Sequence, residues 1–380
     1  MNVIFTCGGT GGHINPAIAV ANMWKERHPD SKILFIGAEG HMEEQLVPKA
    51  GYELRTFPTS GMCRKLNLDG IKRNIKAVTN VLAAVKGCKK IYKEFKPDII
   101  VGTGGYASFP ALLAGKQMKI PTCVHEANAM PGLTTRMAAG WADRVLICFE
   151  ESAKHYKKPE KCIAVGMPVR KEFIFADKAA ARRELGLDER PVILSTFGSQ
   201  GAKMMNLAVA ELMKLEQDAG HPYQHIHGVG SFGIGWFPDK LKELEVDATA
   251  FDIREYIYNM PTVMAAADVV ISRAGASACN EIAASGTPCV LIPSPNVTDN
   301  HQYKNAKVLA DADAAVLIEE KDLTEERLLA IVTELSEDDL RRQHMSEQIA
   351  AFARKDAGRR IYEEITSLLR RREVIKRREP

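Results

Sequence analysis

Short apolar runs alternate with amphipathic segments along the whole chain. Continuous runs rich in Val and Ile are typical of strands that are buried on both faces of a parallel sheet. We expect such strands at 2–7, 32–36, 98–101, 121–124, 144–148, 191–197, 224–228, 268–271 and 288–292. Between them, apolar positions three or four residues apart predict helices near 16–28, 41–50, 71–95, 108–118, 202–219, 277–285, 301–311 and 323–335.

This interleaving predicts an α/β protein with two doubly wound parallel sheets, each covered by helices on both faces. Gly166 and Pro168 interrupt the pattern between two units of comparable size. We therefore place an N-terminal domain at 1–166 and a second domain at 167–355.

Composition narrows the class of protein. A chain of 380 residues is too long for one typical core, and 46% hydrophobic with 26% charged residues is typical of a soluble globular protein. No apolar run approaches the roughly 20 residues of a membrane span, and the chain starts in a strand, so we expect no secretory signal. The eight cysteines are scattered without a C-x-x-C pair, which favours reduced thiols over disulfides or zinc.

Four glycine-bearing turns follow predicted strands, at 8–12, 102–105, 198–201 and 274–276. Ligands of open α/β sheets bind at the carboxyl ends of the strands, so we expect a cleft between the domains that gathers all four turns. A single such turn could be merely a tight connection. Ile14 stands where a dinucleotide fingerprint needs its last glycine, and no G-K-[ST] is present. The turns therefore indicate a phosphate or diphosphate, but neither NAD nor ATP.

The turns belong to six motifs that resemble, in order, the MurG family of glycosyltransferases. They are Gly9-Thr10-Gly11-Gly12-His13, Gly102-Thr103-Gly104-Gly105-Tyr106, His125-Glu126-Ala127-Asn128, Gly198-Ser199-Gln200-Gly201-Ala202, Ser272-Arg273-Ala274-Gly275-Ala276 with Glu281, and His301-Gln302-Tyr303-Lys304-Asn305-Ala306. The resemblance extends from residue 3 to about residue 310.

The resemblance implies two Rossmann-like domains of the GT-B fold and a peripheral enzyme on the cytoplasmic face of the cell membrane. Its donor would be UDP-N-acetylglucosamine and its acceptor lipid I, which becomes lipid II for peptidoglycan. Other proteins of cell-wall synthesis or division are expected as partners. A helix at about 356–369 would pack back on the first domain, followed by a basic tail at 370–380.

His13 is the candidate catalytic base. The positive end of a helix dipole disfavours imidazolium, which keeps a neutral base available near pH 7, and transfer to a sugar hydroxyl needs such a base. The family counterpart is proposed to deprotonate the 4-hydroxyl of the acceptor. Alternatively, His13 only hydrogen-bonds a phosphate, and whether its loop faces the diphosphate of the lipid or that of UDP stays open.

Departure of UDP places charge on a diphosphate, which the N–H groups of Ser199, Gln200 and Gly201 and the Ser199 hydroxyl could stabilise. The Glu281 carboxylate can accept both ribose hydroxyls, although it could instead be a solvated helix residue. The resemblance assigns the donor contacts to Thr10, Gly11, Gly12, Asn128, Arg170, Ser199, Gln200, Gly201, Ile257, Ala276, Glu281 and Gln302.

The acceptor side is assigned to Gly104, Gly105, Tyr106, His125 and Glu126, with a structural role as the alternative for His125. Two residues depart from the family pattern. Met167 stands where asparagine is common, and Phe197 stands where glycine is common. Phe does not readily adopt a positive φ, so Phe197 could change the backbone of the diphosphate turn. His225 and His227 alternate along a strand without a third ligand, and we expect neither a metal site nor a cofactor.

The segment from Met62 to Lys96, both included, contains ten Lys or Arg residues, against only Asp69 and Glu94. Apolar residues at helical spacing are interleaved with them, which favours an amphipathic segment on an anionic bilayer. Simple solvated charge is the alternative, and nucleic acid is disfavoured because aromatic residues are scarce here. The predicted membrane patch is Lys72, Arg73, Ile75, Lys76 and Leu82.

Together these features predict an inverting, metal-independent N-acetylglucosaminyltransferase. A glycosyltransferase that builds glycolipids on diacylglycerol is the enzymatic alternative. A nucleotide-sugar-binding membrane scaffold without catalysis is the alternative from another class.

Overall fold

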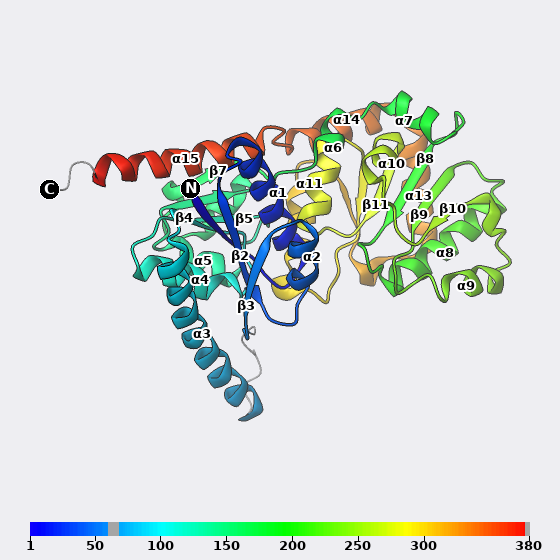
Figure 1. The fold of residues 1–380 in the computed structure, drawn as a ribbon. Helices are drawn as coiled ribbons and strands as arrows, with labels where there is room; N and C mark the ends of the chain where they lie inside the picture. Colours follow the sequence, from blue (N-terminus) through cyan, green and yellow to red (C-terminus); the bar gives the residue numbers. More distant parts are fainter. Residues whose placement is uncertain (60–67, 377–380) are drawn as a thin grey trace. The chain divides into compact units, whose positions relative to one another are not determined.

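The computed structural model describes residues 1–59 and 68–376, without the side chains of residues 68, 70, 71, 73 and 372–376. The chain divides into two compact units (Figure 1). The first unit combines Met1–Pro168 with Arg354–Pro380, and the second is Val169–Ala353. The sequence had placed the two boundaries after residues 166 and 355.

The first unit is built on a seven-stranded parallel sheet in the order β3-β2-β1-β4-β5-β6-β7. Its strands are β1 (Asn2–Thr6), β2 (Lys32–Ala38), β3 (Glu53–Phe57), β4 (Ile99–Gly102), β5 (Thr122–Glu126), β6 (Arg144–Ile147) and β7 (Cys162–Ala164). Its helices are α1 (Gly11–Arg27), α2 (Glu43–Lys49), α3 (Leu68–Phe95), α4 (Ser108–Gln117), α5 (Leu133–Ala139), η1 (Glu150–His155), η2 (Pro159–Lys161) and α15 (Ala357–Lys376).

Helix α15 returns to the first unit and packs on α1. Ile361, Ile365 and Leu368 join the core cluster that contains Trp24. The Tyr362 hydroxyl lies 3.0 Å from His28 Nε2. This apolar contact explains why the last helix belongs to the first unit although it follows the second along the chain.

The second unit is built on a six-stranded parallel sheet in the order β10-β9-β8-β11-β12-β13. Its strands are β8 (Val192–Thr196), β9 (Gln224–Gly228), β10 (Asp252–Arg254), β11 (Val269–Ser272), β12 (Cys289–Leu291) and β13 (Val316–Leu317). Its helices are α6 (Lys171–Phe175), α7 (Lys178–Glu184), α8 (Lys203–Asp218), α9 (Phe237–Glu243), α10 (Met260–Ala266), α11 (Ala276–Ser285), α12 (His301–Ala310), α13 (Glu325–Glu337), α14 (Asp339–Ala351) and the short η3 (Ala248–Ala250), η4 (Thr298–Asn300) and η5 (Glu320–Asp322).

Every strand that the sequence predicted is present, and the four strands that it missed are β3, β7, β10 and β13. These four are the outer strands of the two sheets. An outer strand is partly exposed and lacks the continuous apolar run of a central strand, which was the signal used. The burial agrees: β4 and β11 are buried at every residue, whereas no residue of β7 or β13 is fully buried.

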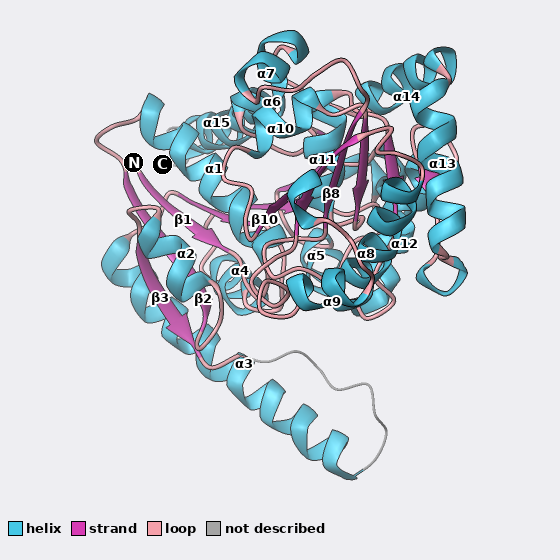
Figure 2. Ribbon diagram, turned by 90° about the vertical axis from the view of Figure 1, so that its right-hand side faces the viewer, coloured by secondary structure: helices cyan, strands magenta, loops and turns pink. Residues whose placement is uncertain are grey.

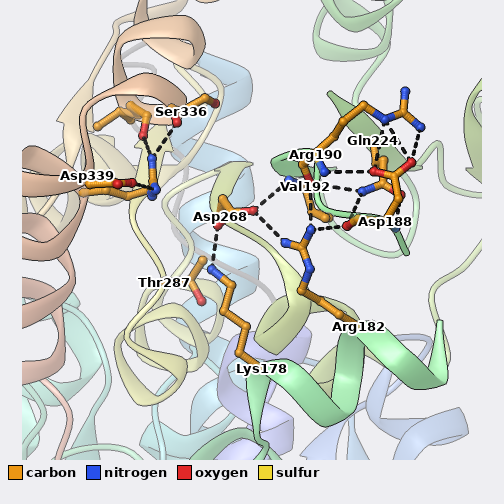
Figure 3. Close-up of polar contacts among 12 residues, drawn as sticks. Lys178, Arg182, Asp188, Arg190, Val192, Gln224, Asp268, Thr287, Ser336 and Asp339 are labelled. Carbon is orange, nitrogen blue, oxygen red and sulfur yellow. Dashed lines mark hydrogen bonds and ion pairs between the residues drawn. The ribbon is translucent and has the colours of Figure 1, made fainter. Parts of the chain in front are cut away.

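A polar network closes the amino ends of the strands in the second unit (Figure 3). The Asp268 carboxylate, just before β11, accepts the Val192 N–H at the start of β8. It also accepts hydrogen bonds from Lys178 and Arg182 of α7, at 2.6 and 3.1 Å. The carboxyl ends of the same strands are thereby left as the edge available for ligands.

Each sheet reverses its strand order once, between β1 and β4 in the first unit and between β8 and β11 in the second. Helices start in opposite directions from such a pair of strands, which leaves a crevice at their carboxyl ends. All four glycine turns follow these four strands. The topology therefore places two turns together in each unit.

Candidate functional site

The two glycine turns of the first unit are in direct contact. Gly104 and Gly105 have φ values of +102° and +80°, which only glycine adopts readily. A Cβ atom on Gly105 would lie 2.1 Å from the Gly8 carbonyl oxygen. The turn after β4 therefore supports the turn after β1 through the backbone, and a side chain at Gly105 would separate them.

Helix α1 begins at Gly11, not near Pro16 as the sequence predicted, and Pro16 lies inside it. Gly11, Gly12 and His13 thus form the first turn of the helix, and the N–H groups of His13 and Ile14 bond to the Thr10 carbonyl oxygen. Proline usually marks a helix start, but Pro16 lies in the second turn, where its missing N–H removes the intrahelical bond to the Gly12 carbonyl oxygen. His13 is consequently held on a helix rather than in a mobile loop.

The contacts of His13 Nδ1 indicate which tautomer the imidazole adopts. Its Nδ1 atom lies 3.2 Å from the Gly8 carbonyl oxygen and 3.3 Å from the Thr10 hydroxyl. A carbonyl oxygen can only accept, so Nδ1 carries the proton and Nε2 is the basic nitrogen. The backbone is fixed too, because the buried Thr103 hydroxyl donates to the His13 carbonyl oxygen at 2.7 Å. The ring lies against Gly104, where a Cβ atom would come within 2.7 Å of it.

The residues assigned to the acceptor side differ in what they contact. Tyr106 lies beside Gly9, and its hydroxyl is 2.8 Å from His41 Nε2. His125 is buried, and its Nε2 donates to the Gly166 carbonyl oxygen at 2.8 Å. Burial lowers the pKa of His125. These contacts favour the structural role for His125.

Glu126 is also buried, and its carboxylate organises the turn that follows β5. It accepts the N–H and the side-chain amide of Asn128, both at 3.0 Å, and the Gly132 N–H at 3.0 Å. Asn128, which the resemblance assigned to the donor, is therefore oriented by Glu126.

In the second unit the turn after β8 interlocks with a second glycine turn after β9, which the sequence analysis did not single out. The carbonyl oxygens of Ser199 and Gln200 accept the N–H groups of Ser231 and Phe232. A Cβ atom on Gly201 would lie 2.1 Å from the Val229 carbonyl oxygen. The repeated glycines of residues 228–230, directly after a predicted strand, were the available signal.

Two expectations about the β8 turn need correction. The Gly201 N–H was assigned to the diphosphate, but it donates to the Gly198 carbonyl oxygen at 3.0 Å. Phe197 does not disturb the turn, because the positive φ of +86° falls on Gly198. The buried Phe197 ring instead joins the core, 6.2 Å from the His227 ring.

The turn after β11 leads directly into α11, whose N-cap is Gly275 and whose first residue is Ala276. One and a half turns later, Glu281 is partly buried. Burial raises the pKa of Glu281 to about 7, although the positive charge of Arg170 opposes this. A carboxyl group that titrates near neutrality is typical of a functional position.

The remaining donor-side residues lie in the same unit. Arg170 is exposed just before α6, with its guanidinium 5.0 Å from the Phe173 ring centre. Ile257 is buried beside Gly228. Gln302 accepts the Ser294 N–H at 2.8 Å through its side-chain oxygen. The side chain of Gln302 is thereby fixed, with its amide nitrogen as the remaining donor.

His225 and His227 belong to a buried polar cluster. The Ser195 hydroxyl lies 2.7 Å from His225 Nε2 and 2.7 Å from His227 Nδ1, and His225 Nδ1 lies 3.0 Å from Glu216. Burial lowers the pKa of His227 to about 3. Within residues 1–59 and 68–376, no group of three or more His, Cys, Asp or Glu side chains is arranged to hold a metal ion.

Helix α3 carries the basic, apolar segment, and Figure 2 shows its first turns extending away from the strands of the first unit. Ile75, Val78 and Leu82 are 60%, 50% and 63% exposed, and Lys72 and Lys76 are exposed beside them. The side chain of Arg73, together with residues 64 and 65, lies outside the described part of the chain. Among the described helices, none has the length and apolarity that a membrane crossing needs.

Glu43, the first residue of α2, is a site residue that was not predicted from the sequence. Its side chain is fully buried beneath the glycine loop after β1 and accepts two backbone N–H groups. Within a predicted surface helix, a Glu beside Glu44 gave no sign of burial. The contact depends on β2 and β1 being neighbours, which only the sheet order determines.

The chain is similar to known proteins along both of its units. Residues 3–147 match the N-terminal domain of glycosyltransferase family 28, and residues 192–361 match its C-terminal domain. A relative from Acetivibrio thermocellus is 39% identical over 97% of this chain and 99% of its own length. One from Bacillus cereus is 36% identical over 98% of this chain and 100% of its own. The first is named UDP-N-acetylglucosamine–N-acetylmuramyl-(pentapeptide) pyrophosphoryl-undecaprenol N-acetylglucosamine transferase, and the second carries the same name with the number 1.

Solved structures agree on the fold. The crystal structure of Acinetobacter baumannii MurG matches with a TM-score of 0.75 and 26% identity, over 96% of this chain and 99% of that one. The calicheamicin glycosyltransferase CalG4 matches with a TM-score of 0.71 over 97% of this chain and 98% of that one. At 13% identity, the second likeness concerns the GT-B fold alone.

Proposed function

We propose that this chain, which belongs to the MurG family within glycosyltransferase family 28, transfers N-acetylglucosamine from UDP-N-acetylglucosamine to lipid I and so forms lipid II. The acceptor group is the 4-hydroxyl of the N-acetylmuramyl sugar on undecaprenyl pyrophosphate. The observation that carries this proposal is the 39% identity, over nearly the full chain, to a transferase named for that reaction.

His13 is the proposed base. Its Nδ1–H donates to the Gly8 carbonyl oxygen, which makes Nε2 the atom that takes the proton of the acceptor hydroxyl. The oxygen then attacks the anomeric carbon of the donor from the side opposite to UDP. One carbon–oxygen bond forms while the bond to the diphosphate breaks, so the α-linked donor gives a β-linked product.

The second unit is proposed to bind the donor. Gly198 and Gly201, with φ values of +86° and +76°, let the backbone approach a diphosphate closely, and the exposed Ser199 adds a hydroxyl donor. The amino end of α11 supplies a positive dipole, and Arg170 supplies a full positive charge. These groups oppose the charge that develops on UDP, and the proposal contains no metal ion. Turnover should therefore persist in excess EDTA.

Glu281 is proposed to accept hydrogen bonds from both ribose hydroxyls. Ile257, one residue from the exposed Tyr256, is proposed to contact uracil through its backbone, and Gln302 to contact the sugar. Their positions in one unit support a common donor site.

The apolar and basic surface of α3 is proposed to hold the enzyme on the cytoplasmic face of the membrane. Ile75 and Leu82 supply apolar area, and Lys72 and Lys76 supply positive charge toward anionic lipids. This placement would bring the enzyme to lipid I and to other proteins of cell-wall synthesis and division. No nucleic acid is part of the proposal.

The test of the reaction is a transfer assay. Purified protein is mixed with UDP-N-acetylglucosamine and either lipid I or diacylglycerol, and the products are identified by mass. We expect lipid II; transfer to diacylglycerol alone would establish the glycolipid synthase instead. His13→Ala should abolish turnover while UDP-N-acetylglucosamine binding persists. A wild-type protein that binds the donor but transfers it to neither acceptor would be a scaffold.

The test of the membrane surface is sedimentation with vesicles of phosphatidylglycerol and phosphatidylcholine at low salt. Replacing Lys72, Arg73 and Lys76 by Glu should weaken vesicle binding without changing donor binding. Charge reversal at three exposed lysines outside α3, Lys157, Lys158 and Lys242, serves as the matched control. Equal binding by the α3 variant and the wild type would refute the assignment.

A further inference from the structure

A buried carboxylate lies directly beneath the loop that carries the proposed base. Glu43 is fully buried, its Oε1 accepts the Ala38 N–H at 2.8 Å, and its Oε2 accepts the Gly9 N–H at 3.3 Å. The glycines around it make room for this side chain. A Cβ atom on Gly8 would lie 2.9 Å from Oε1, and one on Gly37 would lie 2.7 Å from Cγ.

Glu43 and His13 are linked through a single peptide group. The Gly9 N–H that Glu43 accepts and the Gly8 carbonyl oxygen that accepts His13 Nδ1–H belong to the same planar amide. Hydrogen bonds in such a chain polarise one another. A carboxylate that draws the N–H of an amide makes its carbonyl oxygen a stronger acceptor.

We propose that Glu43 is a positioning residue for the reaction, which holds and polarises the Gly8–Gly9 peptide so that His13 keeps its proton on Nδ1 and presents Nε2 as the base. The inference rests on the proposed role of His13. It assigns to Glu43 the function of the carboxylate in a carboxylate–histidine pair, exerted through a peptide group instead of by direct contact.

The Thr10 hydroxyl cannot take over the role of the Gly8 carbonyl oxygen in fixing the tautomer of His13. It lies 3.3 Å from His13 Nδ1, but a hydroxyl can either donate or accept and so does not select a tautomer. The Gly8 carbonyl oxygen can only accept. Its position depends on the Gly9 N–H bond to Glu43 on one side and on the approach of Gly105 on the other.

The decisive variant is Glu43→Gln, which keeps the shape but replaces one oxygen by an NH₂ group. That group cannot accept a backbone N–H, so one of the two hydrogen bonds of Glu43 is lost. Glu44→Gln, at the exposed next residue of the same helix, is the matched control. Transfer from UDP-N-acetylglucosamine to lipid I is measured for the wild type and both variants, each over a range of pH.

We expect E43Q to lower kcat about tenfold or more, with a smaller change in KM for the donor. Loss of a hydrogen-bond partner that orients a metal-binding histidine has an effect of about this size in metalloenzymes. The acid limb of its pH–rate profile should move to lower pH, because the Gly8 carbonyl oxygen, no longer polarised by a carboxylate, becomes a weaker acceptor for the imidazolium. E44Q should match the wild type in each respect. An E43Q protein with the wild-type kcat and profile would overturn the proposal.

A second measurement does not depend on turnover. Two-bond ¹H–¹⁵N correlation spectra of ¹⁵N-histidine-labelled full-length protein report the tautomer of each histidine, and His13→Asn identifies the signal. We expect the proton on Nδ1 in the wild type and a mixture of tautomers in folded E43Q. A wild-type His13 with its proton on Nε2 would overturn the proposal, whether or not the E43Q variant folds.

The His13→Ala variant distinguishes a failure of the proposed base from a failure of the role of Glu43. An active His13→Ala variant would refute the base assignment, and the positioning role of Glu43 with it. An inactive His13→Ala beside a fully active E43Q would leave the base assignment intact and refute the role of Glu43 alone.

Discussion

Replacing Asp268 by Ala should destabilise the second unit, because this carboxylate joins β8, β11 and α7 (Figure 3). Asp268 is 8% exposed. Burial raises its pKa, but the hydrogen bonds from Lys178 and the Val192 N–H lower it further, so the net pKa lies below the usual value. The side chain is therefore an ionised acceptor at neutral pH.

The magnitude follows from the three partners. The Lys178 side chain is 49% exposed, so its contact contributes about 0.5 kcal/mol after solvent screening. The Arg182 side chain is 18% exposed and contributes about 1.5 kcal/mol as a charged hydrogen bond. The Val192 N–H would lose its side-chain acceptor, and a buried donor without an acceptor costs about 1–3 kcal/mol. We take the low end of this range, about 1 kcal/mol, because Asp268 lines a cavity of ≈ 350 Å³ through which water can reach the site.

The sum is about 3 kcal/mol, which at a typical urea slope of about 2 kcal/mol/M lowers the unfolding midpoint by about 1.5 M. Hydrogen exchange read by mass spectrometry along a urea series resolves the units, with peptides of β8 and β11 reporting on the second and peptides of β1 and β4 on the first. Asp188→Asn, at an exposed pair with Arg190, is the control and should leave the midpoint unchanged.

Acid provides a further check on the same network. Because the pKa of Asp268 is lower in the folded protein than in the unfolded chain, its ionised carboxylate stabilises the fold. This stabilisation is fully present above the unfolded-state pKa of about 3.9 and is lost as the pH falls through the folded-state pKa. The difference between wild type and Asp268→Ala should therefore shrink below pH 4. Equal urea midpoints for the two proteins at pH 7, or equal shifts in both units, would refute the reasoning.

Gly105→Ala should abolish transfer while donor binding persists, because its Cβ would lie 2.1 Å from the Gly8 carbonyl oxygen; normal turnover would contradict this contact. His227→Phe should make the stability of the second unit less sensitive to acid. The pKa of His227 is about 3 in the folded protein and about 6.5 in the unfolded chain, so the unfolded chain binds the proton first. The stability of the wild type therefore falls by up to about 1.4 kcal/mol per pH unit below about pH 6.5. Urea midpoints between pH 7 and 5 measure the difference, and parallel curves would count against it. Because the pKa of Glu281 is raised to about 7, donor affinity should increase from pH 6 to 8, and titration calorimetry of Glu281→Gln should show weaker binding without that dependence.

The candidate site was partly predictable because its chemistry is local in sequence. A strand, a glycine turn and a helix start are contiguous, so the turns at 8–12, 102–105, 198–201 and 274–276 could be located from the chain alone. The tautomer of His13 could not be, because it depends on where the Gly8 carbonyl oxygen lies. Glu43 was missed for a similar reason, since its partners belong to the neighbouring strand and turn.

The pattern of apolar residues by itself determined the central strands, most of the helices that cover them and the presence of two doubly wound sheets. It did so because a strand buried on both faces must be apolar throughout, whatever lies beside it. The outer strands β3, β7, β10 and β13 were decided only by the tertiary structure, because their partly exposed residues become a strand by pairing with a neighbour. Tertiary structure likewise decided how the first turn of α1 is held and what Phe197 does, since the distant Thr103 hydroxyl binds the His13 carbonyl oxygen and the Phe197 ring joins the core of the second unit.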